Sequence, residues 1–190
     1  MGELPVLLMG VTMHVYLKSD IVVHMKGISI RYQQIKDAKR FFEILQSENF
    51  IYWENVPATL QDEKNFLRGN TEKRKKNFAH NYSILSRKKV IGAIGIMVNQ
   101  HAPFIAEIGY FVDEAYWGKG VASRAVVLAE EKARELGIKR IEIKMHPKNR
   151  GSEKVAIKNG YRKEGRLRGV IKTASGDYRD VLLYAKLLED

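Results

Sequence analysis

The chain has 190 residues and a formal net charge of +11, and it contains no cysteine. This length accommodates one compact domain with a sizeable core, and the lack of cysteine excludes disulfides, thiolate catalysis and cysteine-ligated metals. No run of residues approaches the ~20 apolar residues that span a bilayer, and the N-terminal stretch MGELPVLLMG lacks the features of a secretion signal, so we expect a cytoplasmic protein without membrane contacts.

The first part of the chain, residues 1–27, is expected to form an extension. Its segments VTMHVYL and IVVHMK alternate apolar and polar residues around the turn residues KSD, a pattern typical of a β-hairpin. We expect this extension to add a hairpin to a sheet edge or a contact in a dimer. The domain proper is expected to cover residues 28–190.

Alternating and helical patterns then follow one another along the chain. Strands are predicted over 28–33, 78–86, 89–98, 104–112, 138–145, 161–171 and 178–187. Helices are predicted over 37–49, 59–69, 119–136 and 151–158, with Asp37 and Thr59 as N-caps and Gly137 ending the third helix. This order predicts a single α/β (α+β) domain with a mixed, mostly antiparallel sheet flanked by about four helices.

The basic charge balance suits an anionic partner: a nucleic acid, a membrane surface, or an anionic cofactor or substrate. The densest basic run, EKRKKN at 72–77, has no interleaved aromatic residue, which favours a solvated helix end over a nucleic-acid site. The five histidines show no metal-ligand spacing, so we expect no metal.

The segment FIAEIGYFV followed by the turn WGKGVA is the strongest candidate for a site. The strand is apolar on both faces, which predicts a central strand buried on both sides and leaves the carboxylate of Glu107 in need of a partner or a function. After the strand, Gly118 and Gly120 allow an anion to approach the first N–H groups of a helix. Ordinary turn chemistry is the alternative for this glycine pair.

Two motifs in order resemble the GNAT superfamily of acetyl-CoA-dependent N-acetyltransferases. Gly120 and Ala122 match its strand-to-helix turn, although Trp117 stands where glutamine or arginine is more usual. Asn149, Ser152 and the pair Gly160–Tyr161 match a second piece. The amino-acid sequence around these motifs is most similar to that of the Rim-type branch, whose members acetylate the N-terminal amine of ribosomal proteins.

The resemblance implies a site for acetyl-CoA as acyl donor. The main chain of Tyr110, Phe111 and Val112 is implied to pair with the pantetheine arm as an extra strand would. The pyrophosphate is implied to bind the main-chain N–H groups of Gly118, Lys119, Gly120, Val121, Ala122 and Ser123. Asn149 matches a position that hydrogen-bonds the cofactor, and the charge of Lys119 and Arg124 is available beside the turn.

The resemblance also implies catalytic and acceptor residues. Glu107 is the candidate base, with an ion pair at the strand end as the alternative. The tyrosine that many GNAT enzymes use as the acid is replaced by Ala156, so Ser152 is implied to donate a hydrogen bond to the departing thiolate, with a helix-start role as its alternative. Tyr52, Trp53 and Glu54 are the candidate acceptor-binding residues, with a packing lid as the alternative.

Three functions follow from these residues. The leading one is acetyl transfer to the N-terminal α-amine of a protein such as a ribosomal protein. The second keeps the chemistry and changes the acceptor to a small amine, of which a polyamine is disfavoured because few carboxylates lie near the acceptor loops. The third is a basic nucleic-acid- or ribosome-binding module. A monomer and a homodimer are both compatible with the sequence.

Overall fold

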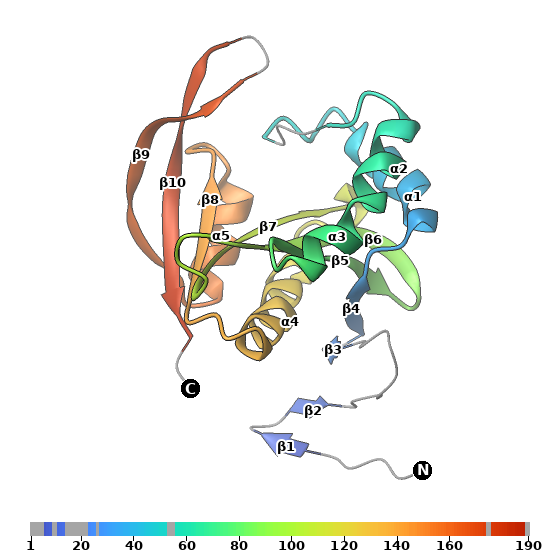
Figure 1. Cartoon of the computed structure of the whole chain (residues 1–190), viewed down its shortest axis with the longest axis horizontal. Coiled ribbons are helices and arrows are strands. Elements are labelled where there is room, and N and C mark those ends of the chain that lie inside the picture. Colours follow the sequence, from blue (N-terminus) through green and yellow to red (C-terminus); the bar gives the residue numbers. More distant parts are fainter. Residues whose placement is uncertain are drawn as a thin grey trace.

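The fold is built on one eight-stranded sheet, to which helices are added on both faces (Figure 1). The structure, a computed structural model, describes residues 6–8, 11–13, 23–25, 27–52, 56–173 and 176–188. The strands of the sheet are β3 (Val23–Met25), β4 (Ile28–Tyr32), β5 (Ala79–Ser86), β6 (Lys89–Val98), β7 (Ile105–Val112), β8 (Arg140–Met145), β9 (Arg162–Lys172) and β10 (Tyr178–Leu187). Their spatial order is β3-β4-β5-β6-β7-β8-β10-β9.

All neighbouring strands of this sheet pair antiparallel except β7 and β8, which are parallel. The parallel pair is joined by a helix, α4 (Val121–Glu135), as the crossover requires. The expected single α/β domain with a mixed, mostly antiparallel sheet and flanking helices is therefore confirmed. The seven strands predicted after residue 27 correspond to β4 through β10.

The described part of residues 1–27 contributes three short strands. β1 (Val6–Leu8) pairs antiparallel with β2 (Val11–Met13), and β3 pairs with β4 at the edge of the main sheet. The predicted turn of the hairpin lies within 14–22, outside the described residues.

Helices α1 (Ala38–Leu45) and α2 (Leu60–Arg68) begin near the predicted caps, but only one cap acts as expected. Thr59 caps α2: its hydroxyl accepts from the N–H of Asp62, and the Asp62 carboxylate accepts from the N–H of Thr59. Asp37 makes no capping bond to α1, because its buried carboxylate binds the guanidinium of Arg31 through two 2.7 Å hydrogen bonds. The capping role predicted for Asp37 was wrong, since its backbone is already helical and its carboxylate accepts from Arg31, Ser83 and the N–H of Gln34 instead of from α1.

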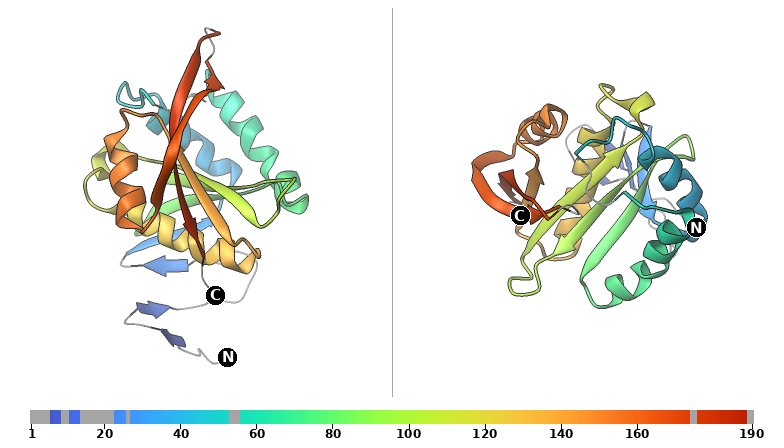
Figure 2. Two further views of the ribbon diagram at one scale, coloured as in Figure 1. Left: turned by 90° about the vertical axis from the view of Figure 1, so that its left-hand side faces the viewer. Right: turned by 90° about the horizontal axis from the view of Figure 1, so that it is seen from above.

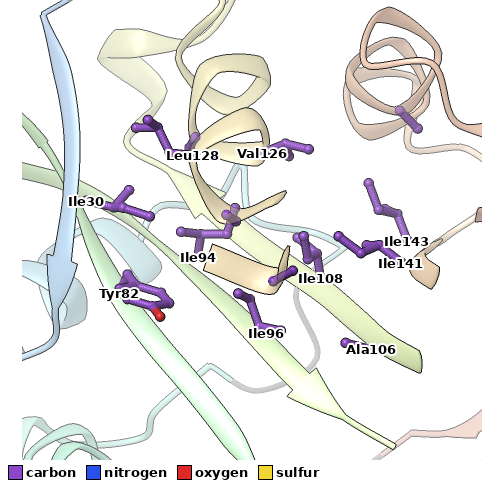
Figure 3. Close-up of a cluster of buried hydrophobic side chains, with 14 of the residues drawn as sticks. Ile30, Tyr82, Ile94, Ile96, Ala106, Ile108, Val126, Leu128, Ile141 and Ile143 are labelled. Atoms are coloured by element: carbon purple, nitrogen blue, oxygen red, sulfur yellow. The ribbon is translucent and has the colours of Figure 1, made fainter. Parts of the chain in front are cut away.

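The larger core lies between the sheet and helix α4. Ile94, Ile96 and Ile108 point from β6 and β7 toward the helix segment that carries Val126 and Leu128 (Figure 3). Helix α5 (Arg150–Lys158) packs against α4 and β8, with the fully buried Ala156 in the same core. The basic run at 72–77 overlaps a short helix, α3 (Asn70–Lys75).

A smaller core lies on the opposite face, where α1 and α2 cover Ala93 of β6 and Phe111 of β7. The view from above separates α1 to α3 from α5 across the strands (Figure 2). This smaller core reaches only one end of β7, so Ile105, Glu107 and Gly109 are half-buried. The prediction that β7 is buried on both faces was therefore wrong for this stretch, because the second face opens on a cavity.

Candidate active site

The two parallel strands β7 and β8 pair over only three positions and then separate. Their ladder ends at Glu107 opposite Glu142, although β7 continues to Val112 and β8 to Met145. Past that point β7 remains paired with β6, and β8 remains paired with β10. A cavity of ≈ 360 Å³ lies where the strands part, and the β9–β10 hairpin lines its other side.

The main chain of β7 faces this opening at alternate residues. Asp113 donates its N–H to Ile91 at the end of β6, and the β6–β7 register has no bulge. Since main-chain groups alternate along an antiparallel strand, Phe111 is directed at β6, whereas Tyr110 and Val112 are directed at the opening. The ring of Phe111 packs edge-on against Phe41 in the smaller core, with ring centroids 5.6 Å apart. Of the three residues that the resemblance implies to pair with the pantetheine arm, Tyr110 and Val112 therefore direct their main-chain groups at the opening, and Phe111 does not.

The turn after β7 has the backbone that an anion site needs. Gly118 and Gly120 both have φ of +71°, a conformation that a side chain strains. Gly120 is the N-cap of α4 and contributes no side-chain cap, so the first-turn N–H groups of Val121, Ala122 and Ser123 lack the intrahelical acceptors of later residues. These groups and the helix dipole favour an anion at this point.

Three cationic side chains surround the turn. Arg124 donates its Nη2 to the carbonyl of Lys119 at 2.8 Å, and Lys119 donates its Nζ to the carbonyl of Ala115 at 2.7 Å. Lys158 comes from α5, and its Nζ lies 3.9 Å from the place that a Cβ on Gly120 would take. Arg124 and Lys119 brace the loop, and the three charges make the turn attractive to a phosphate group.

Trp117 explains how the turn is held against the strand without the usual glutamine or arginine. Its indole N–H donates to the carbonyl of Val112 at 2.6 Å, on the side of β7 that faces the opening. Its ring contacts Phe50 edge-on, with centroids 5.6 Å apart. The tryptophan therefore ties the turn to the end of β7 and to the segment that follows α1.

Glu107 is half-buried and ion-paired in the cavity. Its Oε2 accepts from the Nζ of Lys144 at 2.9 Å, and the same Nζ lies 3.7 Å from Glu142. Burial lowers the pKa of Lys144, but the hydrogen bond and charge of Glu107 raise it above its ordinary value overall. The Glu107 side chain is thus 36% exposed and lies beside the cationic side chain of Lys144.

Ser152 and Asn149 meet Tyr110 at the start of α5. Asn149 caps this helix by accepting from the N–H of Ser152 at 3.0 Å, and the Ser152 hydroxyl lies 2.9 Å from that of Tyr110. Burial raises the pKa of Tyr110 to about 12, although the Ser152 hydrogen bond lowers it slightly. All three residues line the cavity.

The segment after α1 reaches the cavity through Tyr52. Its ring stacks on the imidazole of His146, with centroids 4.9 Å apart and planes inclined by 19°. Trp53 and Glu54 lie outside the described residues. The opposite wall is the β9–β10 hairpin, where the apolar residues facing the cavity are Leu167, Val170, Ile171 and Val181.

Lys144, His146 and Lys158 are site residues that the sequence analysis missed. The alternation of IKRIEIKM places Glu142 and Lys144 on one face of β8, but nothing local reveals that Glu107 lies on the neighbouring strand. Lys158 follows Ser152 by six residues on α5, which is not a same-face helical spacing, so no local signal placed it at the site.

No cluster of three or more histidine, aspartate or glutamate side chains suited to a metal ion occurs in the described part of the chain. Within the same residues, no helix has the length and apolar content needed to cross a membrane.

Comparison with known proteins relates this geometry to acetyl transfer. Residues 28–162 match the acetyltransferase (GNAT) domain. The probable N-acetyltransferase YjcK of Bacillus subtilis is 32% identical over 176 residues, covering 87% of this chain and 96% of that protein. The ribosomal-protein-serine acetyltransferase of Escherichia coli is 29% identical over 140 residues, covering 73% of this chain and 78% of that protein.

Among solved structures, the chain is similar to RimL, a ribosomal L7/L12 α-N-protein acetyltransferase, in complex with coenzyme A. The TM-score is 0.76 at 22% identity, covering 86% of this chain and 96% of that one. At this identity the likeness establishes a shared fold.

Proposed function

The chain belongs to the GNAT family of acetyl-CoA-dependent N-acetyltransferases, and from this membership we propose that it acetylates the N-terminal α-amine of a protein, with a ribosomal protein as the first candidate. The observation that carries the donor half of this proposal is the parting of β7 and β8 directly before the Gly118–Gly120 turn. An extended arm fits along the free edge of β7, and its anionic end then meets the start of α4.

The residues of the cavity divide the chemistry among them. The neutral amine attacks the thioester carbonyl, so the site must accept a proton from the amine and stabilise an oxyanion and a thiolate. Glu107 lines the cavity and accepts the amine proton, directly or through water. The main-chain N–H groups of Tyr110 and Val112 face the opening and are the oxyanion donors, while Ser152 donates to the thiolate.

Asn149 and the turn hold the donor. The Oδ1 of Asn149 is used by the helix cap, and its amide N–H groups have no partner among the described residues, which leaves them for the cofactor. Gly118 through Ser123 offer N–H groups to the pyrophosphate, and the charges of Lys119, Arg124 and Lys158 lie beside it.

The cavity favours an acceptor with a single positive charge over a polyamine. Of its carboxylates, Glu107 is paired with Lys144, and Asp180 is paired with Arg166. A polyamine needs several free carboxylates, whereas a peptide α-amine needs one proton acceptor and space for the residues behind it. The apolar wall of the hairpin and the Tyr52–His146 stack suit the first side chains of a peptide. Two of the compared proteins are named as acting on ribosomal proteins, which supports the same class of acceptor.

The test is a transfer assay over matched amines, read by mass spectrometry. One peptide has a free α-amine and no lysine, a second has a blocked α-amine and one internal lysine, and a polyamine is the third acceptor. We expect acetylation of the first peptide, with Glu107→Gln slow and Glu72→Gln, on an exposed helix away from the cavity, unchanged. Acetylation of the lysine or the polyamine in preference to the α-amine would overturn the proposed acceptor.

A further inference from the structure

Tyr110 and Ser152 form an isolated pair of hydroxyl groups inside the cavity. The two oxygens are 2.9 Å apart, and neither hydroxyl has another hydrogen-bond partner among the described residues. Tyr110 comes from the centre of the sheet and Ser152 from the first turn of α5, so the pair joins two of the elements that line the cavity. The sequence assigned Tyr110 a main-chain role only, and its side chain was left without one.

Counting protons shows what the pair offers to a ligand. Each hydroxyl has one proton to donate, and one of the two protons is used between the oxygens. One O–H donor is therefore left over. A phenol is a stronger donor than an aliphatic alcohol, and the alcohol oxygen is the better acceptor, so the favoured arrangement has Tyr110 donating to Ser152. The remaining proton is then that of Ser152, and its direction is fixed by the tyrosine.

Two further features keep this arrangement in place. Burial holds the pKa of Tyr110 well above neutrality, so the phenol keeps its proton throughout the working range of an enzyme. The main-chain N–H of Ser152 is bound by the cap of Asn149, which fixes the serine backbone beneath the tyrosine. A hydroxyl that accepts one hydrogen bond also becomes a better donor to the next group.

We propose that Tyr110 is a positioning residue, which donates to Ser152 and thereby aims the serine O–H at the sulfur of the leaving thiolate. The inference rests on the proposed function and adds to it the group that orients the donor. As the C–N bond forms and the C–S bond breaks, the electron pair of the C–S bond moves to sulfur, and Ser152 stabilises that charge by a hydrogen bond. The amine proton leaves through Glu107 to water, and the thiolate takes a proton from water, so no proton is gained or lost overall.

The absence of cysteine allows a direct test on the product complex. Because the chain has no cysteine, the thiol of bound coenzyme A is the one thiol in the sample, and the pH dependence of its alkylation by iodoacetamide, followed by mass spectrometry of the coenzyme, reports the pKa of that thiol alone. In the wild type we expect the bound thiol to titrate below the same thiol in Tyr110→Phe and Ser152→Ala by about one pKa unit, the effect of one hydrogen bond to a charged group. The double variant should match the single ones. Tyr178→Phe, which removes an exposed hydroxyl, is the control and should titrate like the wild type.

The outcomes separate the inference from the function it rests on. The role of Tyr110 is overturned, and the cofactor site is not, if coenzyme A stabilises Tyr110→Phe against heat as well as it stabilises the wild type and the pKa of the bound thiol is the same in both. A shift in Ser152→Ala without one in Tyr110→Phe would do the same. A wild type that coenzyme A does not stabilise at all would overturn the proposed cofactor site instead. A second readout is kcat with an aryl thioester, whose more acidic thiol needs less help to leave, so Tyr110→Phe should lose less activity with it than with acetyl-CoA.

Discussion

Replacing Gly120 by alanine tests the anion turn against a control on the same helix. Gly120 begins α4 with φ of +71°, and Gly137 follows its last turn with φ of +77°. A non-glycine residue in this conformation costs roughly 1–2 kcal/mol, and each kcal/mol lowers the melting temperature of a chain of this size by about 2–4 °C. Both Gly120→Ala and Gly137→Ala should therefore lower the melting temperature by similar amounts, roughly 2–8 °C.

The two variants should differ in how they bind acetyl-CoA. A Cβ on residue 120 would lie 3.3 Å from Nη1 of Arg124, so the turn or the arginine must shift, whereas a Cβ on residue 137 meets nothing within 4 Å. Loss of one N–H bond to a charged phosphate costs about 1.5–3 kcal/mol, which weakens binding roughly 10- to 100-fold. Titration calorimetry with acetyl-CoA should show this loss in Gly120→Ala and none in Gly137→Ala. Equal affinities in the two variants would refute the assignment of the pyrophosphate to this turn.

Three further predictions concern single side chains. Glu107→Gln should lower kcat about 100-fold at neutral pH, while acetyl-CoA still binds. The loss of kcat should shrink at high pH, because the acceptor amine is already neutral there. If kcat is unchanged across the pH profile, Glu107 is a purely structural partner of Lys144. Asp37→Ala should lower the free energy of unfolding by about 3 kcal/mol in urea titrations, because it leaves the side chain of Arg31, which is only 12% exposed, without its partner. Burial raises the pKa of Asp37, but hydrogen bonds from Arg31, Ser83 and the Gln34 N–H lower it below its ordinary value overall. The contribution of Asp37 to the stability of the fold is therefore complete above the unfolded pKa of about 3.9 and is lost as pH falls through the folded pKa. The wild type should lose more stability than Asp37→Ala on acidification, and parallel losses in the two proteins would contradict this. Thr59→Ala should cost about 1 kcal/mol through loss of the α2 cap, seen as a lower melting temperature with acetyl-CoA affinity unchanged, and an unaltered melting temperature would show that the cap adds nothing.

Local patterns predicted most of the elements after residue 27, because these strands and helices carry their own period. The short helix α3, which has no side-chain cap, was not predicted as a separate helix. Thr59 shows why this works: its capping box involves only residues three positions apart. Asp37 shows where it stops, since its carboxylate is taken by Arg31 from a strand that the local sequence does not place beside it. The same limit hid the half-exposed face of β7, because the smaller core that covers Phe111 ends before Glu107.

The candidate site divides in the same way. The turn after β7 and the start of α5 are contiguous motifs, so the sequence could provide candidate residues for the donor side. The pairs Glu107–Lys144, Tyr110–Ser152 and Tyr52–His146 each join residues from separate elements, and the contacts appear only once the strand order is known. These contacts determine which carboxylate and which hydroxyl lie in the cavity. The sequence alone therefore could not choose between the catalytic and the structural roles of Glu107 and Ser152.

The proposed donor site requires acetyl-CoA to pair with the free edge of β7 and with the turn after it. Residue-resolved amide hydrogen exchange, with and without acetyl-CoA, tests this directly. We predict new protection at Tyr110 and Val112 and from Gly118 to Ser123, with little change at Phe111, whose N–H is directed at β6. Protection that leaves Tyr110 and Val112 unchanged, or that appears away from the opening between β7 and β8, would contradict the account.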